Sequence, residues 1–136
     1  MPFDLKDLWT AGGVLLGFQV TSFSWRISEE AKVGDKGDYT WIPPADILNL
    51  IAMLVATLGI FVLPVVGLVD VAFVKASFAL STLLFVGHSF AIAGHYELFN
   101  PRTRRSFKYF PLQEKCVVLI VALVVIVYFI LLRRMA

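Results

Sequence analysis

The chain has 136 residues, of which 59% are hydrophobic and 16% are charged, and its formal net charge is +2. Because charged residues make up roughly 25% of an ordinary soluble domain, this composition excludes that class and indicates an integral membrane protein. We expect residues 1–136 to form a single transmembrane domain, since the apolar segments leave no stretch that could bury a separate soluble core.

We predict an all-α integral membrane fold, namely a bundle of four transmembrane helices with a tight hairpin between the second and third helices. A helix needs about 20 mostly apolar residues to cross the hydrocarbon of a bilayer. Four stretches of the chain approach or reach this length. They are residues 8–25, 47–66, 71–94 and 116–132.

The first stretch carries its small residues on one face. Gly13 and Gly17 form a GxxxG pair on this face, which allows two helix backbones to approach closely. The contact can be within the chain or between subunits. Trp9 and Trp25, near the two ends of the stretch, are placed like anchors at the membrane interface.

Residues 26–46 form the long polar connection to the second helix. Their charged side chains, their glycines and the Pro43–Pro44 pair predict a solvated loop rather than a continued helix. The acidic residues lack the spacing of a calcium loop, so we predict no metal site there. Asp46 is expected to cap the second helix.

The second helix has a face of small residues that suits close packing against the third helix. We expect Pro64 and Gly67 to interrupt this helix and a tight turn to follow at residues 67–70. The small residues on the packing face are Ala52, Ala56 and Gly59.

The third helix is the predicted centre of the bundle, because it carries polar groups along its whole length. At about 100° per residue, Ser77, Ser81, His88 and His95 lie within about 40° of one another. Polar groups in membrane helices face other helices or a wet cavity, so this row either lines a wet path or holds the helices together. The two histidines are about 10.5 Å apart along the axis, too far to bind one metal ion together.

Residues 96–115 form a loop in which basic and aromatic side chains alternate. Such a loop beside a bilayer is expected to lie on anionic lipid headgroups or to bind a soluble protein partner, and nucleic acid is the least favoured partner. The contact residues are expected to be Arg102, Arg104, Arg105 and Lys108. The last helix has no polar face and is predicted to be the lipid-facing wall.

The sequence contains no motif for catalysis or for a cofactor, and we expect a protein that is not an enzyme. Our hypothesis is a homo-oligomeric, pore-like or membrane-effector component, because more polar groups face inward than four-helix packing needs. The alternative is a structural or recruiting membrane subunit that docks a soluble partner through residues 96–115.

Four spans place both termini on one side of the membrane, with four basic residues there and eight on the other side. The positive-inside rule therefore predicts that the long loops lie in the cytoplasm and that both termini lie outside, in a plasma (inner) membrane. A reporter that is active only in the cytoplasm should stay silent when it is fused to the C-terminus. An active reporter would contradict this orientation.

Overall fold

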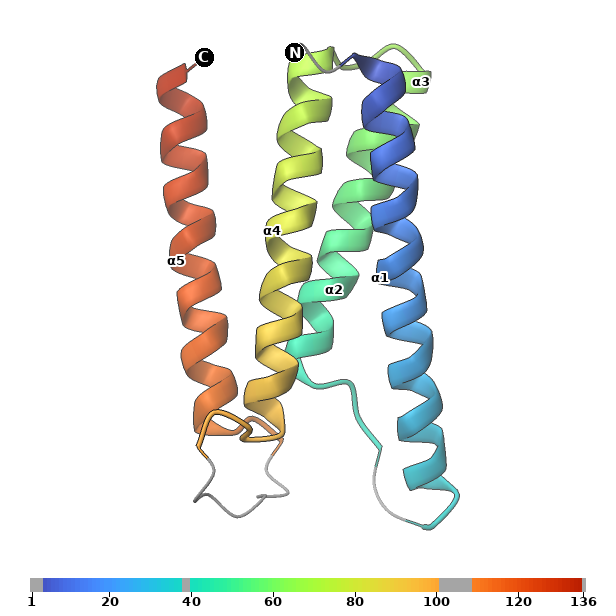
Figure 1. Cartoon of the computed structure of the whole chain (residues 1–136), viewed down its shortest axis with the longest axis vertical. Helices are drawn as coiled ribbons and strands as arrows, with labels where there is room; N and C mark the ends of the chain where they lie inside the picture. Colours follow the sequence, from blue (N-terminus) through green and yellow to red (C-terminus); the bar gives the residue numbers. More distant parts are fainter. Residues whose placement is uncertain (1–3, 38–39, 101–108, 136) are drawn as a thin grey trace.

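The structure is a computed structural model that describes residues 4–37, 40–100 and 109–135 (Figure 1). These residues form helices and contain no strand. Consecutive long segments run in opposite directions. They are α1 (Leu5–Gly34); α2 (Pro44–Ala56), continued by the π-helical segment η1 (Thr57–Val62) and by α3 (Leu63–Val65); α4 (Val71–His95); and α5 (Leu112–Met135).

Three of these segments are long and apolar enough to cross a membrane. They are Pro44–Val65, Val71–His95 and Leu112–Arg134. The segment α1 has the length but not the hydropathy, because Gln19 and several hydroxyl side chains interrupt its apolar residues. The structure is therefore all-α with three candidate membrane spans, where the sequence analysis predicts four.

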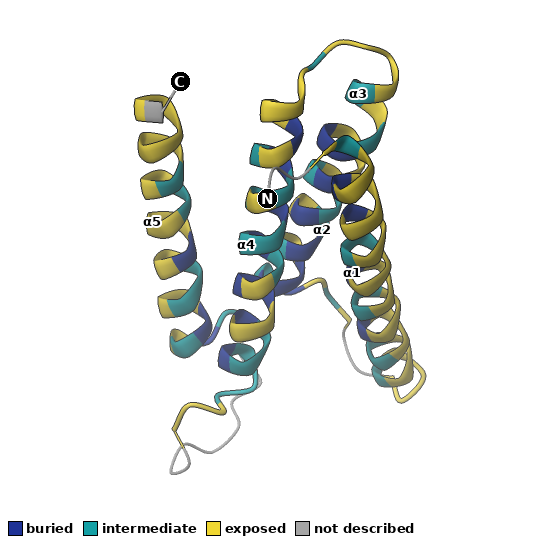
Figure 2. Cartoon of the chain, turned by 45° about the horizontal axis from the view of Figure 1, so that its top comes forward, coloured by how far each residue is buried: buried dark blue, intermediate teal, exposed yellow. Residues whose placement is uncertain are grey.

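The helix α4 lies at the centre of the arrangement and contacts α1, α2 and α5 (Figure 1). Buried residues line the facing sides of α2 and α4, whereas α5 is exposed over most of its surface (Figure 2). Both termini lie at the same end of the bundle (Figure 1). The opposite end carries the connection from α1 to α2 and the connection from α4 to α5.

The predicted loop from residue 26 is wrong for residues 26–34, which continue α1. This segment contains no proline and no glycine before Gly34, so its backbone is free to remain helical. Lys32 Nζ and Glu29 Oε1 lie 2.6 Å apart one turn away from each other, which supports the helix. The turn after α1 includes Gly37 with φ of 82°.

The second helix starts earlier than predicted. Pro43 is its N-cap residue and Pro44 its first residue, so Asp46 is not the cap. Proline suits the first turn because its missing N–H would have no helical partner there and its φ is already close to the helical value. The last helix also exceeds the predicted residues 116–132, since it begins at Leu112, directly after Pro111.

The turn between α3 and α4 is built by local backbone chemistry. Gly67 adopts φ of 72°, a conformation that costs little only for glycine. Asp70 then caps α4 by accepting a hydrogen bond from the backbone N–H of Phe73 at 2.9 Å.

The π-helical segment η1 is tied to α1 by a tryptophan. Pro64 has no N–H, so the carbonyl of Ile60, four residues earlier, lacks its α-helical donor. The indole N–H of Trp9 donates to this carbonyl at 2.8 Å. Trp9 therefore binds another helix, and the interfacial role expected from the sequence stays a prediction.

We expect Trp9→Phe to lower the free energy of unfolding by about 1–2 kcal/mol, because it leaves the Ile60 carbonyl without this donor. Unfolding by a denaturing detergent, followed by circular dichroism, measures the change. Trp25→Phe is the matched control, since Trp25 is 59% exposed. An equal loss in both variants would show that the indole bond contributes nothing specific.

Candidate functional site

Buried and partly buried polar side chains from α1, α2, α5 and α4 with its C-cap residue form a connected cluster in the half of the bundle near the two long connections. We call this set the polar cluster. Nearly all hydrocarbon-embedded polar groups need protein partners, so such a cluster defines how the helices fit together. Its members are Gln19, Ser22, Arg26, Asp46, Asn49, Ser81, His88, His95, Tyr96 and Glu114.

An ion pair between α1 and α2 is the most buried charged contact of the cluster. Arg26 Nε lies 3.1 Å from Asp46 Oδ2, and the two side chains are 2% and 3% exposed. The guanidinium group also donates to the hydroxyl of Tyr96 and to Glu30 Oε1. Each charge therefore depends on its partners, because an uncompensated buried charge is strongly destabilising.

His88 joins α4 to α1 and to α2 through its two ring nitrogens. Nδ1 lies 2.8 Å from the carbonyl oxygen of Ala45, which can only accept, so Nδ1 carries the proton. Nε2 lies 3.2 Å from the hydroxyl of Ser22, which can donate to it. A neutral imidazole is thus satisfied at both nitrogens.

A second group of hydrogen bonds connects α1, α2 and α4 deeper in the bundle. It is formed by Gln19, Asn49 and Ser81. Gln19 Nε2 donates to Ser81 Oγ at 2.8 Å, and Ser81 Oγ donates to the carbonyl of Ala52 at 2.8 Å. Asn49 Nδ2 donates to the backbone carbonyl of Gln19 at 2.9 Å. These bonds fix the register of α1 against α2 and α4.

Glu114 of α5 completes the cluster and is fully buried. Its Oε1 accepts from the backbone N–H of Ala45 at 2.7 Å, and its Oε2 lies 2.8 Å from His95 Nδ1. A carboxylate at a helix N-terminus is favourable because it faces the positive end of the helix dipole. Glu114 therefore supplies the cap that Pro43 cannot.

The predicted row on α4 is divided by the structure. Ser81, His88 and His95 each bind a neighbouring helix. Ser77 is 7% exposed, and its hydroxyl has no hydrogen-bond partner among the described residues. Three side chains of the row are therefore hydrogen-bonded to other helices, and the fourth, that of Ser77, is not.

The small residues predicted to pack lie in two different environments. Ala52 and Ala56 of α2 are fully buried, and a Cβ added at Gly59 would clash with the hydroxyl of Ser77. Gly13 and Gly17 are exposed, and a Cβ at either position would meet nothing within 4 Å. Their neighbour Gly12 makes the close contact within the chain, where an added Cβ would lie 2.9 Å from Ile60 Cγ2.

The basic residues of the connection between α4 and α5 lie outside the described residues. Their contact with lipid headgroups or with a soluble partner stays a prediction. They are Arg102, Arg104, Arg105 and Lys108.

The residues that bind the polar row of α4 were not predicted from the sequence. Gln19 and Arg26 are seven residues apart on one face of α1, which is a usable signal for an inward polar stripe. The roles of Asp46, Tyr96 and Glu114 have no local signal, since their partners lie on other helices.

Groups of three or more His, Cys, Asp or Glu side chains that could hold a metal ion are absent from the described part of the chain. Comparison with known proteins finds no matching family model, no matching curated protein and no matching solved structure.

We expect Arg26→Met to lower the free energy of unfolding by about 3–5 kcal/mol, because it leaves the Asp46 carboxylate buried without its guanidinium partner. Arg26→Met combined with Asp46→Asn should recover much of this loss, since the double variant removes both charges. Unfolding in a denaturing detergent measures the change in the free energy of unfolding for the single and for the double variant.

The matched control for this pair is Lys32→Met, which breaks the exposed pair with Glu29 and should cost less than about 1 kcal/mol. A loss in Arg26→Met no larger than in Lys32→Met would contradict a structural role for the buried pair.

Proposed function

We propose that this chain is a non-enzymatic structural subunit of a membrane assembly. In this proposal all four long helical segments span the membrane, and two or more copies associate through the outward face of α1. The observation that carries the proposal is the open GxxxG face, with Gly13 and Gly17 exposed on a helix whose other side is packed against α2 and α4.

The contacts of α1 support its placement across the membrane. It is bonded to η1 through Trp9 and to α2 through Arg26, and these two positions are about 25 Å apart at 1.5 Å per residue. That separation is close to the hydrocarbon thickness of about 30 Å. A bilayer that surrounds α2, α4 and α5 therefore also surrounds α1. The polar side chains Gln19 and Arg26 point into the bundle, where Gln19 donates to Ser81 and Arg26 is paired with Asp46.

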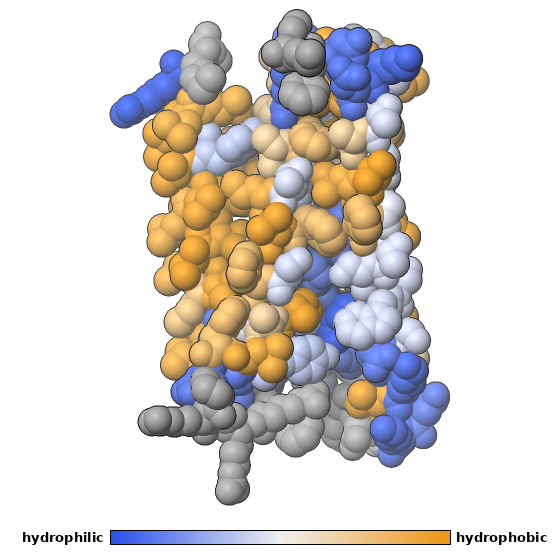
Figure 3. Space-filling model, in the orientation of Figure 1, coloured by the Kyte–Doolittle hydropathy of each residue, from blue (hydrophilic) through white to orange (hydrophobic). Residues whose placement is uncertain are grey.

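The outward face of α1 suits another helix better than lipid. Thr10 and Thr21 donate their hydroxyls to backbone carbonyls of their own helix, at 3.0 and 2.8 Å. With these groups satisfied, the face is small and smooth, which favours close backbone contact. Figure 3 shows the contrast: the side of α5 is strongly apolar, and the side of α1 is paler. We infer a second copy of this chain as the partner.

The polar cluster supports a structural role for the interior. Ser81, His88 and His95 are all engaged in bonds between helices, as expected for groups that hold a bundle together. Recruitment of a soluble partner through residues 96–115 remains part of this proposal, with that loop in the cytoplasm and both termini outside the plasma (inner) membrane.

A second candidate is the oligomeric pore, and the hydroxyl side chains on the open face of α1 favour it. In a ring of copies, Thr10, Thr21 and Ser24 would line the conduit, since all are exposed in the single chain. The polar row of α4 would then contribute to packing rather than to the path.

We expect Gly17→Ile to dissociate the assembly, because the added side chain separates two helix backbones at their closest contact. Overpacking of this kind costs about 1–3 kcal/mol, which corresponds to roughly a 5- to 150-fold weaker association. Mass measurement in mild detergent at several protein concentrations detects the change.

The matched control is Ala11→Ile, which adds an isoleucine at an exposed position of α1 on a different face. An assembly whose mass is unaffected by Gly17→Ile would contradict the proposed interface. Ion flux through reconstituted vesicles separates the two candidates: flux that Gly17→Ile abolishes supports the pore, and ion-tight vesicles support the structural subunit.

A further inference from the structure

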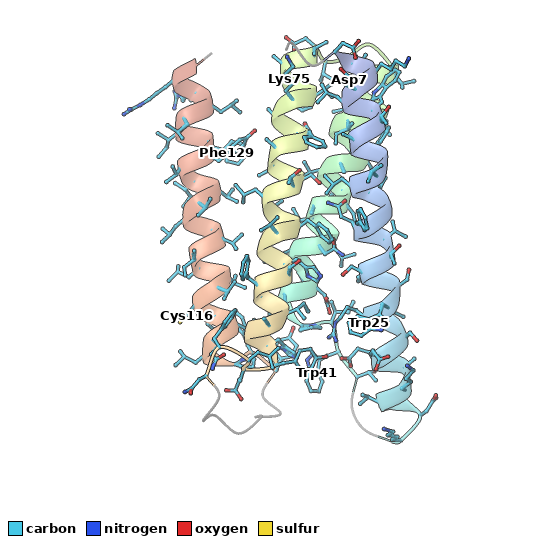
Figure 4. The ribbon with its side chains drawn as sticks, viewed as in Figure 1. Asp7, Trp25, Trp41, Lys75, Cys116 and Phe129 are labelled. Atoms are coloured by element: carbon cyan, nitrogen blue, oxygen red, sulfur yellow. The ribbon has the colours of Figure 1, made fainter. Side chains whose placement is uncertain are left out.

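A pocket of about 390 Å³ lies between the C-terminal half of α1 and the connection to α2, at the end of the bundle opposite the termini. Figure 4 shows one of its residues, Trp41, at this end. Asp46, another, is the third residue of the candidate span Pro44–Val65, and Trp41 precedes this span by three residues. The pocket therefore lies at the level of the lipid headgroups, where membrane tryptophans are common.

Two polar atoms on residues of this pocket are buried and have no hydrogen-bond partner among the described residues. They are Oδ1 of Asp46, on a side chain that is 3% exposed, and the indole Nε1 of Trp41. His88 Nδ1 lies 3.8 Å from this Oδ1 and donates to the carbonyl of Ala45 instead. The Trp41 ring packs against the ring of Tyr109, with 6.0 Å between the centroids. Because unpaired buried polar atoms are unfavourable, a ligand that pairs with both atoms would stabilise the protein.

The two unpaired atoms and the charge of the pocket indicate the chemistry of its ligand. A carboxylate oxygen only accepts and an indole N–H only donates, so the ligand must bring both a donor and an acceptor. The charged side chains that line the pocket are Arg26, Glu30 and Asp46. Two carboxylates against one guanidinium leave one negative charge, which favours a cationic donor such as an ammonium group. A single water molecule, with a share of about 30 Å³ in the liquid, fills only a small part of this volume.

The surroundings of the pocket favour a lipid headgroup as the source of these groups. Ile27 and Ile42 line the pocket and are 52% and 51% exposed, so apolar side chains lie at its mouth. A phosphatidylethanolamine headgroup joins a primary ammonium, which donates, to phosphate oxygens, which accept. The quaternary ammonium of choline has no N–H to donate. The additional carboxylate of a serine headgroup is disfavoured by the negative charge of the pocket.

We propose that this pocket binds the headgroup of one phosphatidylethanolamine molecule. Its ammonium group donates to Asp46 Oδ1 and to the Glu30 carboxylate, and its phosphate accepts from the indole N–H of Trp41. The inference goes beyond the proposed function and does not depend on the interface between copies. At about 100° per residue, Arg26 and Glu30 lie about 140–180° away from Gly17 around α1, so the pocket and that interface use different faces.

Native mass spectrometry of the purified full-length protein in mild detergent tests the proposal. The protein is mixed with equal amounts of phosphatidylethanolamine and phosphatidylcholine that carry the same acyl chains. We expect each chain to retain one phosphatidylethanolamine molecule, with a preference of at least about 10-fold over phosphatidylcholine. This is the effect of losing a hydrogen bond to a charged group, since choline cannot donate to the buried carboxylate.

Two variants sharpen this test, and each should weaken retention of phosphatidylethanolamine by about 2- to 10-fold, the effect of one hydrogen bond. Trp41→Phe removes the indole N–H and keeps an aromatic ring. Glu30→Gln removes a negative charge, and its amide oxygen can still accept from Arg26, which preserves the fold. The matched controls are Trp25→Phe, at an exposed position, and Glu29→Gln, whose side chain pairs with a lysine outside the pocket. Neither control should change retention.

Equal retention of the two lipids by the unmodified protein would overturn the proposal, and so would a preference that both pocket variants leave unchanged. Displacement of the lipid by an equal concentration of free phosphoethanolamine would also overturn it, since a soluble amine would then be the occupant. Gly17→Ile should keep the preference for phosphatidylethanolamine. Loss of the oligomer and loss of headgroup binding are therefore separate outcomes.

Discussion

Three helices of this chain are long and apolar enough to cross a membrane, and polar side chains packed between such helices have no water to bind, which is the constraint on which this structure depends. A polar side chain there finds its partner in the protein or remains unfavourable. Arg26, Asp46 and His88 meet this requirement together, because each lies on a different helix and each is bonded across a helix boundary. The relative positions of α1, α2 and α4 follow from these bonds as much as from apolar contact.

Much of the fold could be predicted from the sequence, because hydropathy and helix punctuation are local signals. The bounds of α4 and the turn at Gly67 follow from the apolar run, the glycine and the capping aspartate. The end of α1 could not be predicted in this way. Residues 26–34 are polar enough for a loop, yet nothing in them breaks a helix, and the bonds that hold Arg26 lie in distant parts of the chain.

The candidate site was predictable only in part. Helical periodicity places Ser81, His88 and His95 on one face, but it cannot say what they meet, since Ala45 and Glu114 are brought there by tertiary packing. The same limit applies to glycines. Spacing marks Gly13 and Gly17 as a packing pair. In the structure it is Gly12 that packs closely against another helix, and Gly13 and Gly17 lie on the exposed face of α1.

The cap that Glu114 provides has a consequence for biosynthesis. The carboxylate and the backbone N–H of Ala45 that it accepts from are 69 residues apart in the chain. While the ribosome is still making α5, the start of α2 and the imidazole of His95 have no such partner. Completion of this corner of the bundle must therefore wait for α5, so the last helix to be made is also the one that joins the start of α2 to the end of α4.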